Sequence, residues 1–459
     1  MYRYLFTALS TILFTIVHAQ SITGDWTGNL EMQGMKLPLV LHFTQRGDSL
    51  VSTMDSPAQG AKGIPVDNTI FTNNQLSFEL KNLRISYKGL MVGDSISGTF
   101  TQGGFDIPLV LKRKDGEDTA IYNRPQTPKP PFNYTIEDVS FINPTEGNTL
   151  AGTLTTPSNK KQFPVVVMIT GSGAQDRDET LFGHKPFWVI ADHLTQNGIG
   201  VLRLDDRGVG GSSKGKGGAT SADFATDIDA AVNFLLKKGF KNIGLIGHSE
   251  GGMIAPMVAD RNKNVKFIIS MAGPGIPIEE LMLLQVEAVN KAVGSSEATT
   301  KGNIDLSKSV YSFIKAYKGA DLKADLKTHV LDCLKKNPGM VPHDKIEEIA
   351  ENATAQPGSE WFAYFIKAEP QLNIQKLKIP VLALNGNKDI QVLSKQNLAG
   401  WKASLEKAGN KNFKIVEMDG LNHLFQEAKT GAPAEYGQIE QTISPQVLDL
   451  MTKWILTLK

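Results

Sequence analysis

Cysteine is almost absent from this chain. Cys333 is the one cysteine among 459 residues, so no disulfide can form within the chain. It lies in an apparently helical stretch, where a lone thiol most simply acts as a small apolar residue. No group of histidines with cysteines or glutamates has the spacing of metal ligands. We therefore expect no metal and no other cofactor.

The chain also lacks an excess of positive or negative charge. The chain has 48 Lys and Arg against 47 Asp and Glu, a formal net charge of +1. Such a balance gives no support for nucleic acid or an anionic membrane surface as a partner. A hydrophobic content of 41% and a charged content of 21% are typical of a globular protein. The length favours two domains rather than one.

Long apolar runs are absent after the first twenty residues. Residues 2–17 combine Arg3 with an apolar run, and Val17-His18-Ala19 then has the pattern of a small-residue cleavage site. We predict a secretory signal peptide at residues 1–19 and a periplasmic or extracellular mature protein, with an uncleaved anchor as the alternative. No later segment has the length and hydrophobicity of a membrane span. The oligomeric state is left open.

Residues 20–115 predict a small all-β, barrel-like domain, because short alternating strands are separated by Gly, Asn and Asp turns. Residues 28–41 and 98–111 form a weak repeat, which predicts two hairpins in equivalent places. A structural or docking role is favoured over a ligand-binding cup, since no convergent polar groups are found. A proline-rich stretch, Arg124–Pro131, marks residues 116–136 as an extended linker.

Residues 137–459 alternate strands with helices. Continuous apolar segments such as Val-Val-Val-Met-Ile are typical of a sheet buried on both faces, and predict a mostly parallel, doubly wound α/β sheet. The expected strands are Asp138–Ile142, Thr149–Thr155, Val165–Ile169, Gly200–Leu204, Ile243–Ile246, Phe267–Met271, Val381–Leu384 and Phe413–Met418.

About a hundred residues between the sixth and seventh expected strands show helical periodicity and no clear strand. This is too long for a loop, and we predict a helical cap inserted at about residues 275–375. Its aromatic run contains Trp361, Phe362 and Phe365, which we expect to contact substrate. Packing within the cap alone is the alternative.

Ser249 lies in Gly247-His248-Ser249-Glu250-Gly251, directly after the apolar segment Ile243–Ile246. A G-x-S-x-G sequence where a strand is followed by a helix holds the serine hydroxyl above the sheet, on a turn so tight that only glycines fit beside the serine. We therefore predict a nucleophilic serine. A serine in a buried turn is the alternative.

A serine hydroxyl needs a general base, and the base needs an acid to orient it. Of eight histidines, His423 follows the last expected strand. Loops at the carboxyl ends of parallel strands share one edge, so His423 can meet Ser249 there. Asp389 follows the preceding strand and is the predicted acid, with Asp419 as the alternative. The order Ser249, Asp389, His423 is that of nucleophile, acid and base in α/β-hydrolases.

The oxyanion of a tetrahedral intermediate needs amide donors. We expect the backbone N–H of Glu250, at the start of the helix after Ser249, to be one donor. The second donor is predicted to be Gly173 or Ala174, in the loop after Val165–Ile169.

Five separated motifs carry a family resemblance. They are Gly171-Ser172-Gly173-Ala174-Gln175-Asp176-Arg177-Asp178-Glu179, Leu204-Asp205-Asp206-Arg207-Gly208-Val209-Gly210, the serine motif, Asn387-Lys388-Asp389 and Asn422-His423. In this order they resemble exported bacterial α/β-hydrolases described as serine-aminopeptidase-like or cinnamoyl-esterase-like, from about residue 138 to the C-terminus. The resemblance implies the α/β-hydrolase fold and esterase-type chemistry. The His-Gly-Gly-Gly oxyanion motif of lipases is missing, which argues against that branch.

Asp176, Arg177, Asp178 and Arg207 recur in the motifs of that family. We expect them to form a salt-bridge network that fixes the oxyanion loop rather than to bind substrate.

The hypothesis is therefore a secreted serine hydrolase that cleaves small-molecule carboxylic esters with small acyl or aryl groups, through a Ser-His-Asp triad and an acyl-enzyme. An aminopeptidase or acyl thioesterase of the same fold is the first alternative. A glycan- or lipid-binding protein with a vestigial hydrolase domain is the second, and the complete triad argues against it.

Overall fold

The computed structural model describes residues 21–32, 35–47, 49–57, 61–102, 105–114, 122–158, 160, 162–216, 219–336 and 345–458. The chain divides into two compact units, one built from most of the residues up to 116 and one built from residues 117–459 together with the short segments 30–38 and 56–62. The predicted signal peptide at residues 1–19 lies outside the described residues, as do residues 115–121 at the start of the predicted linker.

The N-terminal unit is a nine-stranded antiparallel sheet curved into a half-barrel. Its strand order is β4-β3-β2-β1-β9-β8-β7-β6-β5. Trp26 on β1 is fully buried in its core, and the indole N–H donates to the carbonyl of Ile22 at 2.8 Å. The strands are β1 (Gly24–Met32), β2 (Met35–Arg46), β3 (Ser49–Ser56), β4 (Ala61–Pro65), β5 (Asn68–Thr72), β6 (Gln75–Leu80), β7 (Ile85–Val92), β8 (Ser95–Gln102) and β9 (Phe105–Arg113).

The repeat seen in the sequence falls on equivalent strands. Leu39 and Leu41 on β2 are buried, as are Leu109 and Leu111 at the matching positions of β9. The order β2-β1-β9-β8 places the two hairpins side by side in the sheet. Alternate residues of each strand face the core because successive side chains of a strand point to opposite faces.

The second unit is built on an eight-stranded sheet of order β10-β11-β13-β12-β14-β15-β16-β17. The first two strands are antiparallel, and every pairing from β13 to β17 is parallel. All eight predicted strands are present: β10 (Tyr134–Ile142), β11 (Thr149–Pro157), β12 (Val165–Ile169), β13 (Gly200–Leu204), β14 (Ile243–His248), β15 (Val265–Met271), β16 (Val381–Gly386) and β17 (Phe413–Met418). The predicted fold class is confirmed.

Helices cover both faces of this sheet, which is why its central strands are entirely buried. On one face α1 (Pro186–Gln196) and α11 (Pro445–Thr457) pack against the strands. On the other face lie α2 (Ser221–Lys237), α3 (Glu250–Arg261) and α10 (Ser394–Lys407).

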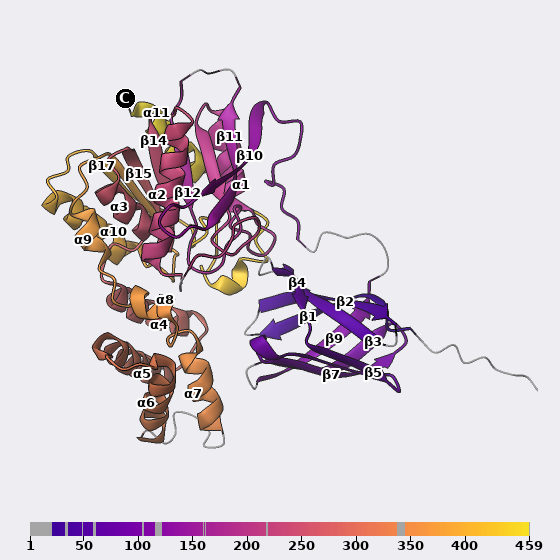
Figure 1. Cartoon of the computed structure of the whole chain (residues 1–459). Helices are drawn as coiled ribbons and strands as arrows, with labels where there is room; N and C mark the ends of the chain where they lie inside the picture. The colour runs from indigo at the N-terminus through magenta and orange to yellow at the C-terminus, as the bar shows by residue number, and fades with distance from the viewer. Residues whose placement is uncertain are drawn as a thin grey trace, which may run out of the picture. The chain divides into compact units, whose positions relative to one another are not determined.

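The insertion between β15 and β16 is helical, as predicted. Figure 1 shows α4 to α8 gathered at one end of the sheet. They share a hydrophobic core of their own, to which Met253 of α3 and Val392 also belong. The helices are α4 (Ile278–Ala292), α5 (Glu297–Ala316), α6 (Leu322–Lys336), α7 (Ile346–Ala355), α8 (Glu360–Phe365) and α9 (Pro370–Ile374).

The proline-rich segment is packed onto the second unit instead of standing free as a spacer. The guanidinium of Arg124 donates to the carbonyl oxygens of Phe182, Gly437 and Ile439 at 2.7 to 3.0 Å. Gln126 bonds to the backbone of residues 442 and 443. Composition indicated an extended chain, but the polar anchors between its prolines fix that chain against the domain.

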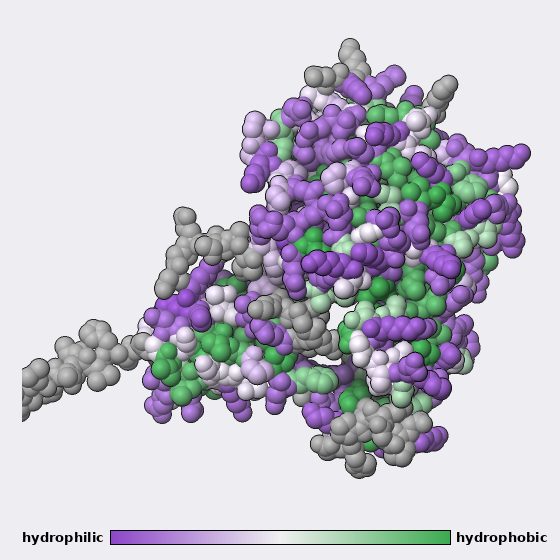
Figure 2. Space-filling view, turned by 180° about the vertical axis from the view of Figure 1, so that it is seen from behind, coloured by the Kyte–Doolittle hydropathy of each residue, from purple (hydrophilic) through white to green (hydrophobic). Residues whose placement is uncertain are grey.

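The surface visible in Figure 2 is mainly hydrophilic, with hydrophobic residues exposed in smaller groups between the polar ones. Within the described ranges, no helix has both the length and the apolar character needed to cross a bilayer.

Candidate active site

Ser249 occupies a strained turn between β14 and α3. Its φ of 52° and ψ of −118° are sparsely populated for a residue with a side chain. Its amide donates to the carbonyl of Met271 at 2.9 Å. A Cβ on Gly247 would lie 2.0 Å from the carbonyl oxygen of Gly251, and one on Gly251 would lie 2.2 Å from that of Ile169. The G-x-S-x-G spacing is therefore required by sterics.

His423 and Asp389 form a buried pair after the last two strands. His423 Nδ1 lies 2.7 Å from Oδ2 of Asp389. The other carboxylate oxygen accepts the amides of Gln391 and Val392 at 2.8 and 2.9 Å. An ionised carboxylate only accepts, so the proton of a neutral His423 lies on Nδ1 and Nε2 is left as an acceptor.

Ser249 and His423 line one cavity of about 120 Å³. The predicted alternative acid, Asp419, is exposed and accepts a hydrogen bond from Asn387 at 2.7 Å. Asp389 is thus the carboxylate that the structure pairs with His423.

The loop after β12, residues 170–175, is held by Asp206. One oxygen of Asp206 accepts from the hydroxyl of Thr170 at 2.8 Å, and the other accepts from the amide of Gln175 at 2.9 Å. Burial raises the pKa of Asp206 to about 7. A carboxyl group that titrates near neutral pH therefore fixes this loop.

Ser172 borders both cavities of this region. Gly171 and Ser172 line the cavity with Ser249, but the Gly171 amide already donates to a carboxylate at 2.7 Å. Gly173 and Ala174, the predicted oxyanion donors, line a second cavity of about 310 Å³ together with Ser172. Of Ser172, Gly173 and Ala174, Ser172 is thus the one that lines the cavity with Ser249.

Arg177 and Asp178 belong to an ion-pair cluster beside this loop. Arg177 binds Asp205 through two contacts, at 3.0 and 2.7 Å, and Asp178 pairs with the buried Arg203. Asp176 accepts the amides of Asp178 and Thr180 at 3.0 and 2.9 Å. The segment that follows the oxyanion loop is thereby tied to the end of β13.

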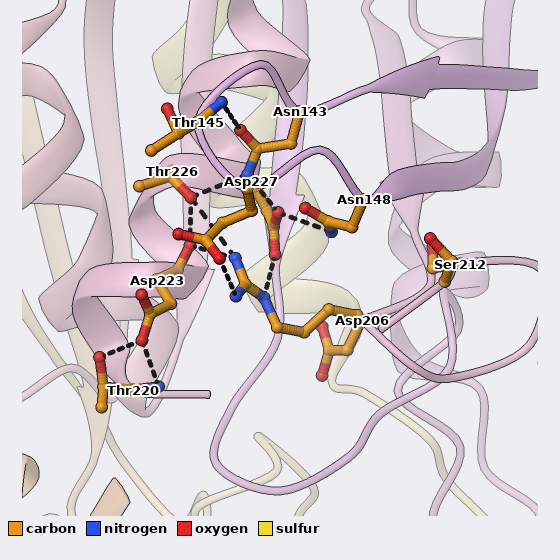
Figure 3. Close-up of polar contacts among 12 residues, drawn as sticks. Asn143, Thr145, Asn148, Asp206, Ser212, Thr220, Asp223, Thr226 and Asp227 are labelled. Carbon is orange, nitrogen blue, oxygen red and sulfur yellow. Dashed lines mark hydrogen bonds and ion pairs between the residues drawn. The ribbon is translucent and has the colours of Figure 1, made fainter. Parts of the chain in front are cut away.

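Arg207 belongs to a different cluster, centred on Asp227 of α2. Its Nε donates to Asp227 at 2.7 Å, and Asn143 and Asn148 of the β10–β11 turn donate to the other oxygen at 2.7 and 3.2 Å. Figure 3 shows Asn143 and Asn148 converging on Asp227, with Asn143 also donating to Thr226. The structure thus has two separate polar clusters where we predicted a single network. The cluster around Asp227 ties α2 to the β10–β11 turn.

Residues 164–300 match the sequence profile of the α/β-hydrolase fold. The second unit has the α/β-hydrolase fold. The chain is 28% identical over 311 residues to esterase EstD of Thermotoga maritima, a match that spans 67% of this chain and 66%, just under two thirds, of that protein.

Two solved structures are also similar to the chain. Esterase Pf2001 of Pyrococcus furiosus is 15% identical, with a TM-score of 0.43 over 73% of this chain and 96% of the other. The α/β-hydrolase GrgF of Penicillium sp. sh18 is 16% identical, with a TM-score of 0.42 over 70% and 98%.

The three predicted cap aromatics lie in two environments. Trp361 lines the 310 Å³ cavity of the hydrolase domain, and its indole N–H donates to Glu250 at 3.0 and 3.2 Å. Phe362 and Phe365 are buried in the hydrophobic core of the cap. Trp361 stacks on Phe365 with ring centroids 5.0 Å apart. Of the three, Trp361 is the one that borders a cavity.

Sequence reasoning gave no role to Glu179, Asp206 or Tyr436. Glu179 and Asp206 lie inside motifs that were noted, but their contacts depend on how the loops fold. Tyr436 lines the Ser249 cavity and receives a hydrogen bond from Gln391 at 2.9 Å. It lies in an irregular stretch without a local pattern, so no signal in the sequence marked it.

No group of three or more His, Cys, Asp or Glu side chains could hold a metal ion in the part of the chain that the structure describes. His184, in the wall of the Ser249 cavity, bonds to the hydroxyl of Thr442 at 2.8 Å and to the carbonyl of Tyr436 at 3.0 Å. Burial lowers the pKa of His184 to about 4, so it is neutral at pH 7.

Proposed function

We propose that this protein hydrolyses carboxylic esters, with Ser249 as nucleophile, His423 as general base and Asp389 as the acid that orients it. This proposal rests on one observation: the strained Ser249 turn and the His423–Asp389 pair meet at one cavity. Similarity to a protein named an esterase supports ester hydrolysis as the reaction.

The proposed reaction has two halves. In the first, Ser249 Oγ bonds to the ester carbonyl carbon while Nε2 of His423 takes the hydroxyl proton, and the imidazolium then gives that proton to the leaving alcohol. In the second, a water attacks the acyl-enzyme with the same proton transfers, releasing the carboxylic acid and restoring Ser249. Asp389 stabilises the imidazolium through the 2.7 Å hydrogen bond to Nδ1.

The oxyanion is proposed to accept hydrogen bonds from the amides of Glu250 and Ser172. Glu250 opens α3, where the first amides of a helix have no partner within the helix. Ser172 replaces the Gly173 or Ala174 of the sequence prediction because it borders the Ser249 cavity.

The two cavities suggest where the two groups joined by an ester bond would bind. The 310 Å³ cavity, with Phe224 and Trp361 in its wall, suits the larger apolar group of an ester. The 120 Å³ cavity around Ser249 and His423 suits a small group. We propose small acyl or aryl esters as the substrate class.

Export is proposed on the sequence of residues 1–19, through a charged start, an apolar run and a small-residue cleavage site. N-terminal sequencing of protein recovered from the periplasm or medium should find Gln20 first. An N-terminus at Met1 on cell-associated protein would contradict export with cleavage.

Ser249→Ala is the direct test of the function. We expect it to abolish hydrolysis of p-nitrophenyl acetate and labelling by a fluorophosphonate, with the melting temperature nearly unchanged because no large cavity opens. A panel of feruloyl esters, acyl thioesters and aminoacyl anilides compared by kcat/KM separates the esterase from its alternatives. Wild-type activity in the variant, or absence of labelling in the wild type, would refute the proposal.

A further inference from the structure

Glu179 and His248 form a second buried acid–base pair beside Ser249. Oε1 of Glu179 accepts the amide of Gly171 at 2.7 Å and lies 3.0 Å from Nδ1 of His248. The other ring nitrogen of His248 lies 3.0 Å from the backbone carbonyl of His423. Both side chains are 8% exposed. The pair therefore connects the oxyanion loop, the serine turn and the histidine loop.

The partners determine where the protons lie. The His423 carbonyl can only accept, so Nε2 of His248 donates to it, and a carboxylate oxygen can only accept, so Nδ1 donates as well. His248 is thus a cation when all these bonds are made. Burial alone would lower the pKa of His248, but the charge and hydrogen bond of Glu179, with the His423 carbonyl and the charge of Asp389, together raise that pKa.

The ionisable groups facing His248 come from three loops. Glu179 follows β12, Asp389 follows β16, and His423 follows β17 with its ring centroid 4.9 Å from that of His248. Both carboxylates favour the His248 cation. The mechanism proposed above uses His423 and Asp389 directly and leaves Glu179 and His248 without a role.

The backbone of Glu179 shows that its position is enforced. Its φ is 52°, in the left-handed region that a residue with a side chain seldom adopts. Such strain persists only where the surroundings over-determine the conformation, and it concentrates at functional sites.

We infer that Glu179 and His248 are positioning residues, which hold the oxyanion loop and the His423 loop in one fixed arrangement around Ser249. Both border the Ser249 cavity, but the proposed proton transfers do not pass through them. Their effect is on the placement of the oxyanion donor and of the base, and its kinetic test rests on the proposed esterase activity.

Glu179→Gln is the sharpest probe because it changes charge and almost no volume. One glutamine oxygen can still accept from both Gly171 and Nδ1 of His248, but Nε2 can donate to the His423 carbonyl at the same time only while His248 is protonated. Without the carboxylate charge, the buried His248 loses its proton at lower pH. Either the Gly171 amide or the His423 carbonyl then has no partner, because both bonds depend on the same Glu179 atom and the same imidazole.

We expect the alkaline limb of the kcat–pH profile to move at least one pH unit lower in Glu179→Gln. Near pH 8 kcat should fall by about tenfold or more, with KM changed less than twofold, because one pKa unit corresponds to a tenfold change in the protonated fraction. Asp25→Asn is the matched control: it removes the charge from a 2.8 Å carboxylate–imidazole contact with His42, in the N-terminal unit, and should leave the profile unchanged.

A measurement that does not depend on catalysis tests this inference independently of the proposed function. In ¹⁵N-histidine-labelled Ser249→Ala protein, the His248 imidazole, assigned by its loss in His248→Gln, should titrate at least one unit lower when Glu179→Gln is added. An unchanged His248 titration, or a kcat lowered equally at every pH, would overturn the positioning role. Wild-type protein that hydrolyses no ester, with the His248 titration shifted as expected, would instead refute the proposed function alone.

Discussion

Replacing Trp361 by phenylalanine removes the indole hydrogen-bond donor and one of its two fused rings, and keeps an aromatic ring at the position. The indole nitrogen lies 3.0 and 3.2 Å from the two oxygens of Glu250, a buried carboxylate whose other side-chain donor is the hydroxyl of Ser221 at 2.5 Å. A phenyl ring can keep the stacking contact with Phe365. The variant therefore isolates the bond that joins the cap to the helix after Ser249.

The magnitude follows from the charge of the acceptor. A hydrogen bond to a charged group contributes about 1.5–3 kcal/mol and one between neutral groups about 0.5–1.5 kcal/mol. Burial raises the pKa of Glu250, and the bonds from Ser221 and Trp361 pull that pKa part of the way down. Loss of Trp361 raises the pKa further, so the folded variant favours protonated Glu250 more than the wild type does. Its stability relative to wild type must then fall as pH rises.

Thermal unfolding at pH 5 and pH 8 measures this. We expect the hydrolase transition of Trp361→Phe to fall by about 2 °C at pH 5 and about 4–6 °C at pH 8, at roughly 2 °C per kcal/mol for a large domain. Trp401→Phe is the matched control, because its buried indole donates over the same 3.0 Å to the neutral carbonyl of Gly273. Its shift should be independent of pH. Equal shifts for Trp361→Phe at both pH values would refute the reasoning.

Asp389→Asn should lower kcat on the order of 10³-fold or more, because the carboxylate that is 2.7 Å from His423 loses its charge, whereas Asp419→Asn should cost less than threefold. Steady-state kinetics on p-nitrophenyl acetate measures both variants, and the reverse ranking would make Asp419 the acid. Phe365→Ala should lower the melting temperature and depress every ester alike, because this ring is cap core; a selective loss of bulky esters would place it in the substrate pocket. A shortened chain beginning at residue 122 should fold and retain activity, whereas one beginning at residue 132 should melt lower because it lacks Arg124; equal melting temperatures would show that the Arg124 contacts contribute nothing.

Apolar continuity was enough to predict the central sheet. Segments such as Val165–Ile169 have no polar residue that could face water, so only a sheet covered on both faces accommodates them. The meeting of Asp389 with His423 could also be predicted, because parallel strands bring their carboxyl ends to one edge. His423 and Asp389 lie after adjacent strands, as that argument required.

Contacts among loops could not be predicted in the same way. Asp206 and Arg207 are neighbours in one motif, yet Asp206 fixes the oxyanion loop and Arg207 fixes α2. Which of two adjacent side chains turns toward which partner depends on the loop backbone, which has no periodicity to indicate it. The aromatic run of the cap was ambiguous for a related reason. In α8 the side chains of Trp361 and Phe365 lie one turn apart on the same face and stack, so helical periodicity cannot tell which of the two borders a cavity.

Arg124 makes contacts that can form only late in the synthesis of the chain. Its partners at Gly437 and Ile439 are more than 300 residues away in sequence, and closing so long a loop is entropically costly. The same irregular stretch supplies Tyr436 to the wall of the Ser249 cavity. A chain emerging from the ribosome therefore has its serine turn, Ser249, long before it has that wall. The proposed hydrolytic activity should therefore require synthesis past Tyr436, and a chain released earlier would expose the Ser249 turn in an incomplete cavity.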